Sequence, residues 1–529
     1  MPTQNSFTSK QARDLEALQT KARLIGTQEG KEKVKVVDHF KQQLGTSSPR
    51  PSTFDWSALG TSTPISPPWK PHFPKRRSKR PSSPCRGFTG IFFKSCWDIV
   101  KNDLSAAFNQ LHNMNRQDFD LLNTGNIVLI PKKLDATRVG DYRPISRIHS
   151  IAKIFFKLLA NKLAPLLDQL VSKCQSAFIR KRCIQDNFLY VQNVVRQFHK
   201  AKTPALFLKL DIQKVFDTIN WSYLLEMLQA CGFGPCWREW ISILFSTTSS
   251  RALINGVPGE SFDHRRGVRQ GDPLSPMLFI LAIDPLQKIL DLATQQGVLT
   301  PLPLTAAKLR TSIYTNDAAI FLSPAHDQLQ AIKQILLTFG VVTGLVTNFD
   351  KSSVHPIRCE DVDLAAILQP FQGACMTFPC KYLGLQLHTR PLQKVHGQRL
   401  AGWKGKLLNR AGCLTLITSV VSSMPTYHLT IFCLAKWARK KIDKVRHSFL
   451  WKGTDNAHGG HCLVNWPTIC LTKNLGGLGV LDHDCFGCPL RLYNSKTWAG
   501  LLIPCNNADR LLFQASISIS IGNGKKTKF

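Results

Sequence analysis

Acidic side chains are scarce in this sequence. Only 34 Asp and Glu residues stand against 68 Lys and Arg in 529 residues, which leaves a formal net charge of +34 at pH 7. A shortage of acid on this scale favours a polyanionic partner such as nucleic acid, because cationic side chains that contact phosphates release counterions, and this term dominates affinity. A basic surface that serves only solubility is the alternative interpretation.

Several other features are absent. The first residues, MPTQNSFTSKQARDLEALQ, are polar and charged, so they lack the pattern of a secretory signal peptide. The 16 cysteines are scattered singly, which argues against a disulfide framework and predicts free thiols in a reducing compartment. We therefore expect an intracellular protein of the nucleus or cytoplasm. The basic run KRRSKR (75–80) could act as a nuclear localisation signal or be accidental charge.

A membrane span and a zinc site are not expected. Residues 413–435 carry no charged side chain and are long enough to span a bilayer, but they contain Pro425, His428 and several hydroxyl groups. Their apolar residues recur at helical spacing, which predicts a core helix instead. The CFGC run at 485–488 and the neighbouring cysteines fit no compact zinc spacing. The sequence also has no internal repeat.

The chain nevertheless contains enough apolar residues for a large core. Its hydrophobic fraction is 43%, and its length predicts two or three domains. Residues 46–86 are dense in Pro, Ser and basic side chains and are not expected to pack. Strands are predicted over 126–131, 205–212, 311–322 and 378–388, and helices over 10–44, 93–111, 146–170, 184–199, 221–230, the residues after Pro273, 327–344 and much of 400–450. Strands and helices that alternate irregularly indicate an α+β fold.

Two aspartates stand at the ends of predicted strands. Asp211 closes the strand ALFLKLDI (205–212), in which Lys209 and Asp211 face one side and the leucines face the other. Asp317 lies at the tip of the hairpin IYTNDAAIFL (313–322). Two carboxylates brought together repel each other unless a cation lies between them, and Mg²⁺ binds one or two carboxylates together with substrate phosphates. Taken singly, a cap and a turn former explain these residues equally well.

Three motifs in order resemble the palm of a reverse transcriptase: LKLDIQKVFDTINWSYL, RGVRQGDPLSPMLFILAIDPL and IYTNDAAIFL. The series is similar to that of LINE-type (non-LTR) retrotransposons, particularly the plant type, and covers about residues 87–529. The resemblance implies a right-hand polymerase of fingers, palm and thumb with a helical C-terminal region. It predicts an N-terminal remnant with a basic linker over 1–86, fingers and palm over 87–390, and a thumb-like helical region over 391–529.

The resemblance also implies catalytic residues. Asp211 resembles the first metal-binding aspartate, and Lys351 resembles a lysine that assists the departure of pyrophosphate. At the hairpin tip the family has two consecutive aspartates, whereas this chain has Asn316 followed by Asp317. The metal ligands that remain are therefore Asp211 and Asp317. An amide removes one negative charge where the metals need it. We therefore expect the hairpin to fold but the protein to synthesise DNA poorly.

Further residues resemble the nucleotide-binding positions of the family. Phe216 resembles the aromatic residue beneath the nucleotide sugar, which excludes a 2′-hydroxyl group. Gln270 and Gly271 resemble the loop that lines the incoming nucleotide and the template. Lys132 and Arg143 resemble the basic residues of the fingers that grip the triphosphate. A core aromatic, a simple turn and solvated surface charges are the alternative interpretations.

Other departures from the family suggest a decayed and truncated element. Lys181 stands where the family usually has glycine, and Val215 stands where a small alanine usually precedes the aromatic residue. The endonuclease domain that usually precedes the polymerase is missing, and the sequence ends before the Cys/His-rich terminal segment of the family. We expect a degenerate copy of the family's polymerase region.

The predicted function is therefore an RNA-directed DNA polymerase that adds deoxynucleotides to a primer 3′-hydroxyl by two-metal catalysis. Its cofactors would be two Mg²⁺ ions, with Mn²⁺ as the alternative, and its partners an RNA template, a DNA primer and deoxynucleoside triphosphates, with no membrane. Asn316 is expected to impair it. A catalytically inactive relic that still binds nucleic acid is the alternative, and an RNA-folding cofactor of the maturase type is a third.

Overall fold

The computed structural model describes residues 31–47, 50–60, 90–112, 119–303, 309–371, 373–389, 409–422, 436–452 and 463–482. The chain divides into two compact units, residues 1–383 and 384–529. Residues 61–86 of the Pro/Ser-rich basic segment, the KRRSKR run and the CFGC run lie outside the described residues. The expectation that all of 46–86 would not pack is wrong for residues 50–60, whose aromatic and polar side chains contact the rest of the first unit. The predicted domain boundaries at 86 and 390 stay predictions.

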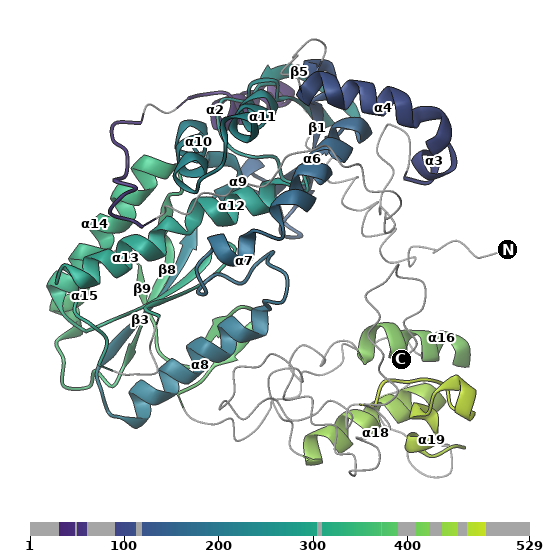
Figure 1. The fold of residues 1–529 in the computed structure, drawn as a ribbon. Coiled ribbons are helices and arrows are strands. Elements are labelled where there is room, and N and C mark those ends of the chain that lie inside the picture. Colours follow the sequence, from purple (N-terminus) through teal and green to yellow (C-terminus); the bar gives the residue numbers. More distant parts are fainter. Residues whose placement is uncertain are drawn as a thin grey trace. The chain divides into compact units, whose positions relative to one another are not determined.

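The first unit contains the sheet that carries both predicted carboxylates. Its strand order is β6-β7-β3-β8-β9. Figure 1 labels β3, β8 and β9 of this sheet. The strands are β3 (Ala205–Ile212), β6 (Thr311–Tyr314), β7 (Asp317–Leu322), β8 (Thr347–Ile357) and β9 (Ala374–Cys375). β3 lies in the middle and pairs antiparallel with β7 on one side and β8 on the other. The predicted strand at 205–212 and the hairpin at 311–322 are confirmed.

Both faces of β3 are covered, which explains its nearly continuous apolar sequence. Leu206, Leu208 and Leu210 are fully buried in the main core, together with apolar residues of several helices. These helices include α10 (Trp221–Ala230), α11 (Pro235–Ser246), α12 (Ser275–Ile283), α13 (Pro285–Gln295) and α14 (His326–Thr343). Helix α8 (Ile184–Lys200) packs on the other face of the sheet, where Phe198 stacks on Phe321. On this second face Phe207 contacts the rings of Phe321 and Tyr382. The predicted helices near 184–199, 221–230, after Pro273 and 327–344 are confirmed.

A second, four-stranded sheet has the order β2-β1-β4-β5. Its strands are β1 (Thr124–Pro131), β2 (Tyr142–Ile148), β4 (Ser249–Ile254) and β5 (Val257–Asp263). β1 confirms the predicted strand, but β2 shows that the helix predicted over 146–170 begins too early. Residues 146–148 pair with β1, and the helical residues are α6 (Ser150–Leu163) and α7 (Leu167–Leu170).

The β4–β5 hairpin was not predicted, although its turn carries a strong sequence signal. Asn255 and Gly256 both have positive φ, 54° and 79°, as a type I′ turn requires. Asn-Gly is the preferred pair for this turn, because both residues adopt positive φ at little cost. Helices α3 (Gly90–Ser95), α4 (Trp97–His112) and α5 (Phe119–Leu122) precede β1, and α4 agrees with the predicted amphipathic helix.

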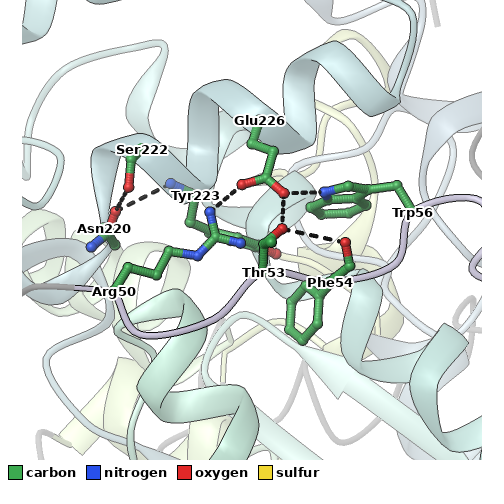
Figure 2. Close-up of polar contacts among 8 residues, drawn as sticks. All are labelled: Arg50, Thr53, Phe54, Trp56, Asn220, Ser222, Tyr223 and Glu226. Atoms are coloured by element: carbon green, nitrogen blue, oxygen red, sulfur yellow. Dashed lines mark hydrogen bonds and ion pairs between the residues drawn. The ribbon is translucent and has the colours of Figure 1, made fainter.

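An N-terminal strap, residues 50–60, packs on α10. Figure 2 shows its contacts with Glu226, whose carboxylate accepts hydrogen bonds from Arg50, Thr53 and Trp56, the last at 2.5 Å. The indole of Trp56 also stacks on the ring of Tyr223, with centroids 6.0 Å apart. Helix α2 (Lys31–Leu44), which precedes the strap, packs its apolar side chains against the four-stranded sheet. Residues 31–44 agree with part of the predicted helix over 10–44.

The second unit contains helical segments around a small core. They are α16 (Arg410–Leu416), which continues as a π-helical turn (Ile417–Val421), α18 (Lys436–Lys452) and α19 (Trp466–Cys470). Cys413, Ile417, Phe449 and Ile469 pack together there. The helical region predicted beyond 400 agrees with these segments. Within the described ranges, no helix has the length and hydropathy that a bilayer span requires.

Glu226 provides a test of the strap. Replacing it with Ala leaves the guanidinium of Arg50, whose side chain is 9% exposed, without its carboxylate. We expect Glu226→Ala to destabilise the docked strap by about 1–3 kcal/mol, the cost of a buried polar group without its partner. Limited chymotrypsin digestion should then cleave after Phe54 and Trp56 of the strap faster than in the wild type.

The control is Glu260→Ala. Glu260 is 83% exposed and lies 3.8 Å from Lys41, so its loss should change stability little. Equal cleavage rates in the Glu226→Ala and Glu260→Ala chains would show that Glu226 does not anchor the strap.

Candidate active site

The pairing of β3 with β7 brings the two predicted carboxylates together. Asp211 and Asp317 are directly opposite residues in this antiparallel register. Side chains of directly opposite residues point to the same face of a sheet, with Cβ atoms about 5 Å apart. Both residues are half-buried. The structure therefore places Asp211 beside the hairpin tip, as the sequence predicted. The catalytic roles of these residues stay predictions.

Asn316 lies beside this pair at the hairpin tip. Its side-chain Nδ2 donates a hydrogen bond of 3.2 Å to Oδ1 of Asp211, and its backbone oxygen accepts one of 3.2 Å from the amide of Ile212. Thr315, the preceding residue of the turn, has a positive φ of 53°. The turn therefore holds Asn316 against Asp211, and the amide presents a donor to the carboxylate where an acid would present a negative charge.

Burial and two neighbouring charges shift the pKa of Asp317. Burial raises the pKa of its carboxyl group above the ordinary value, and the negative charge of Asp211 raises it further, whereas the ammonium of Lys209 lowers it. Lys209 pairs with Ala319, so it lies diagonally across from Asp317 on the same face. A second positive charge at this point would stabilise both carboxylates in their ionised forms.

The residues present can hold a divalent cation in part. Asp211 and Asp317 supply two carboxylates on one face, which fits the one or two that Mg²⁺ usually takes from a protein. The described residues contain no group of three or more His, Cys, Asp or Glu side chains suited to a metal ion. A site for two cations would therefore lack a third acidic ligand, at the position of Asn316.

The turn after β3 carries Phe216. This residue lies in α9 (Val215–Thr218), and its half-buried ring packs against Phe279 with centroids 5.3 Å apart. Its backbone oxygen accepts a hydrogen bond of 2.5 Å from the amide of Val268. The next residue, Asp217, is only 6% exposed, and burial raises its pKa to about 6. Its Oδ1 accepts a hydrogen bond of 3.2 Å from Nε2 of Gln270.

The loop with Gln270 and Gly271 lies against β2. The backbone oxygen of Gln270 accepts a 2.7 Å hydrogen bond from the amide of Ser146. Gly271 has φ of +115°, and a Cβ atom there would lie 2.7 Å from the carbonyl oxygen of Ser146. Only glycine satisfies both conditions, because other residues are strained at this φ. The loop is thus fixed between α9 and β2, as a wall for a substrate pocket would need to be.

Two buried charges support the same loop. Arg269 is 5% exposed and donates to the backbone oxygen of Asn123 at 2.7 Å and to the side-chain oxygen of the same residue. Burial lowers the pKa of Arg269 to about 10 and raises that of Asp272 to about 6, while each charge partly offsets the shift of the other. Asp272 accepts a 2.7 Å hydrogen bond from the amide of Leu274, just before α12.

The remaining predicted residues are exposed. Lys132 and Arg143 flank the β1–β2 connection, and Nζ of Lys132 donates to the backbone oxygen of Gly140 at 2.9 Å. Lys351 lies on a bulge of β8, where the register with β3 shifts between Lys209 and Asp211. The structure brings Lys132 near α9, since its charge acts on Asp217. It shows no comparable link between Lys351 and the carboxylate pair.

Departures noted in the sequence have visible consequences. Lys181 adopts a positive φ of 69°, a conformation that suits glycine and costs an ordinary side chain about 1–2 kcal/mol. Val215 is 7% exposed and packs into the main core. Sequence reasoning did not identify Asp217, Arg269 or Asp272 as parts of the site. Their signal was weak, because a lone charged residue in a motif does not reveal whether it is buried.

Comparison with known proteins agrees with this architecture. The chain matches the family described as reverse transcriptase (RNA-dependent DNA polymerase) over residues 130–387. The transposon TX1 uncharacterized 149 kDa protein of Xenopus laevis is 25% identical over 384 residues, which are 69% of this chain and 28% of that protein. The Pol polyprotein from the type-2 retrotransposable element R2DM of Drosophila melanogaster is 27% identical over 267 residues, 49% of this chain and 24% of that protein.

Among solved structures, the telomerase of Candida tropicalis in complex with a fragment of telomeric RNA aligns with a TM-score of 0.38 and 14% identity, over 58% of this chain and 50% of that one. The chain spans about a quarter of the length of the two curated relatives named above.

The two sheets, the paired aspartates on β3 and β7 and the family match define a right-hand polymerase of the α+β class. The reverse transcriptase match over residues 130–387, together with relatives from the TX1 and R2 elements, supports a reverse transcriptase of the LINE type (non-LTR).

Gly271 offers a test of the loop geometry. In Gly271→Ala, the added Cβ atom meets the carbonyl oxygen of Ser146 and the residue keeps an unfavourable φ. We expect a loss of about 1–3 kcal/mol in stability, the usual cost of a strained backbone conformation. The melting temperature, followed by circular dichroism, measures it.

Gly234→Ala is the matched control, because a Cβ atom at Gly234 meets nothing within 4 Å and its φ is −63°. A melting temperature lowered equally in both chains would contradict the close contact between the loop and β2.

Proposed function

We propose that this chain carries an RNA-directed DNA polymerase site that lacks one carboxylate. The observation that supports the proposal is the placement of Asp211 opposite Asp317 on paired strands, with the amide of Asn316 bound to Asp211. The substrates would be a primer 3′-hydroxyl, an RNA template and deoxynucleoside triphosphates. The family match supports the reaction class, and the local geometry supports the impairment.

The predicted residues would divide into metal ligands, triphosphate contacts and residues that line the nucleotide pocket. Asp211 and Asp317 would hold divalent cations, which supply charge neutralisation and Lewis acidity to phosphoryl transfer when bound. Lys132 and Arg143 would contact the triphosphate from the exposed end of the β1–β2 hairpin. Phe216, Gln270 and Gly271 would form the wall against the sugar and the base, and Lys351 would stand on the β8 bulge to meet the departing pyrophosphate.

Asn316 weakens this site for two physical reasons. It contributes no negative charge, so two adjacent cations would be held by fewer anionic ligands. Its Nδ2 also occupies Oδ1 of Asp211, an oxygen that a cation would otherwise bind. The carboxylate of Asp211 thus already has a hydrogen-bond donor within the protein. A cation would have to displace the amide of Asn316 before it could bind both oxygens of Asp211.

Asn316→Asp should restore synthesis. Loss of one member of a catalytic set commonly lowers the rate by about 10³-fold or more, so the variant should extend an oligo(dT) primer on poly(rA) about 10³-fold faster than the wild type. The assay uses Mg²⁺ and, separately, Mn²⁺. Asp211→Ala in the Asn316→Asp chain should abolish the activity gained.

Asn255→Asp is the matched control, because it makes the same change at a positive-φ turn in the other sheet. It should leave primer extension at the wild-type rate. Extension by the wild type as fast as by Asn316→Asp would contradict the proposed impairment.

Metal binding should change together with activity. In Asn316→Asp, a third carboxylate beside Asp211 and Asp317 adds repulsion without metal, so its melting temperature in EDTA should lie below that of the wild type. A cation at about 100 times its Kd stabilises a protein by about 2.7 kcal/mol. Mn²⁺ should therefore raise the melting temperature of Asn316→Asp more than that of the wild type or Asn255→Asp. Equal increases in all three chains would show that residue 316 does not act on a metal site.

A second candidate function is nucleic-acid binding without synthesis. The net charge of +34 and the internally satisfied Asp211 favour it. On this reading an RNA–DNA hybrid would bind the wild type and Asn316→Asp equally, with an affinity that falls steeply as salt rises, and neither chain would extend a primer. Filter binding over a salt series, set beside the extension assay, distinguishes the two candidates.

A further inference from the structure

A glutamine from helix α2 lies against the turn that follows β3. Gln43, in the last turn of α2, is 8% exposed. Its Nε2 donates a 2.7 Å hydrogen bond to Oδ2 of Asp217, and its Oε1 accepts one of 2.8 Å from Nζ of Lys214. The two ends of the amide thus face opposite charges, so only one orientation of the side chain satisfies both partners.

Gln43 is itself held in place. Val36, Val37, Phe40 and Leu44 of α2 are buried in a cluster with Ile127, Ala252 and Phe262 of the four-stranded sheet. The backbone oxygen of Gln43 accepts a 2.7 Å hydrogen bond from Nε of Arg266, and the oxygen of Leu44 accepts one from the amide of Arg265. The helix is therefore anchored by its own packing, and Gln43 is presented at a fixed position.

The two partners of Gln43 flank Phe216. Lys214 immediately precedes α9 and has a left-handed φ of 47°, and Asp217 follows Phe216. The other carboxylate oxygen of Asp217, Oδ1, accepts a hydrogen bond from Nε2 of Gln270, which belongs to the loop against β2. One chain of hydrogen bonds therefore runs from Gln43 through Asp217 to Gln270 and ties three separate segments around the predicted sugar-binding residue.

Positive charge gathers at the same place. Burial lowers the pKa of Lys214, and the charges of Lys132 and Arg266 lower it further, while Asp217 acts in the opposite direction. Lys214 and Lys132 thus act on the buried carboxylate of Asp217, and Arg266 adds a third positive charge that acts on Lys214. The excess positive charge suits an anionic ligand with several charges, such as a triphosphate.

We propose that Gln43 is a positioning residue of the nucleotide site, which holds Lys214 beside Lys132 to receive the triphosphate of a deoxynucleotide and fixes Asp217 to keep Phe216 and Gln270 in place. The inference rests on the proposed polymerase function. Lys214 becomes a further nucleotide-contacting residue, and α2 becomes part of the catalytic domain.

The test compares Gln43→Met with Gln42→Met in the full chain. Methionine is close to glutamine in size and shape but cannot make either hydrogen bond. The side chain of Gln42 is exposed, so its replacement is a matched control. The probe is dTTP, bound to a complex of the chain with poly(rA) and an oligo(dT) primer that ends in a dideoxynucleotide, so that no synthesis is needed.

We expect the Kd for dTTP to rise about tenfold in Gln43→Met, roughly the effect of 1.4 kcal/mol, and to stay unchanged in Gln42→Met. Hydrogen exchange followed by mass spectrometry should become faster over 213–219 and 268–272 in Gln43→Met alone, with β3 unchanged as evidence that the variant is folded.

The outcomes separate the inference from the proposed function. Equal Kd values for dTTP in the two variants, or equal exchange rates in the two segments, would overturn the role of Gln43. A tenfold change in Kd would support it even if Asn316→Asp extends no primer, and that failure would count against catalysis alone. Absence of dTTP binding in every chain would overturn both.

Discussion

The register between β3 and β7 is the constraint on which the rest of the site depends. Side chains alternate between the two faces of a strand, so a slip of one residue would move Asp211 into the leucine-filled core and its neighbours out of it. Burial of Leu206, Leu208 and Leu210 prevents such a slip, because exposing them would cost about 1.5–3 kcal/mol each. The apolar side of β3 therefore determines where its polar side lies.

From that register the local chemistry follows. Asp317 has to stand opposite Asp211, and the tight turn before it has to place Asn316 at the end of β3. The side chain of Asn316 has two polar neighbours: its Nδ2 donates to the carboxylate of Asp211, and its Oδ1 accepts from the hydroxyl of Thr315. An acid there would need a cation, whereas an amide supplies its own N–H. The same fold thus accommodates either a metal-dependent site or an internally satisfied one.

Much of this could be predicted from the sequence, and the exceptions have physical reasons. The alternation in β3 and the polar tip of the 311–322 hairpin are local patterns, and both predicted the structure correctly. β8 was missed because its buried side chains include Ser352, Ser353 and His355, which are polar; Ser352 bonds to the backbone of Asn348, and Ser353 bonds to Nε2 of His355. Such a strand has no apolar alternation to recognise.

The early start predicted for α6 has a similar cause. Ser146 and the residues around it carry no strand signal of their own, and they are extended because β1 and the backbone of Gln270 take their hydrogen bonds. Tertiary pairing overrides local preference in such a segment. The assignment of carboxylates to the site needed only order and spacing, but the burial of Asp217 could not be read from either.

The contacts of Gln43 show where sequence reasoning ends. The residue is 174 positions from Asp217, so no local pattern links the two. The apolar positions of α2 place Gln43 nearer the buried face than Gln42, but only the tertiary packing shows that its amide meets Asp217 and Lys214. The pKa of Asp217 is raised although Lys214 and Lys132 lie nearby. The desolvation of its carboxylate therefore exceeds the stabilisation that these two positive charges provide. A neutral amide that donates to such a carboxylate lowers that cost without adding charge, which an arginine or lysine at the same place could not do beside Lys214.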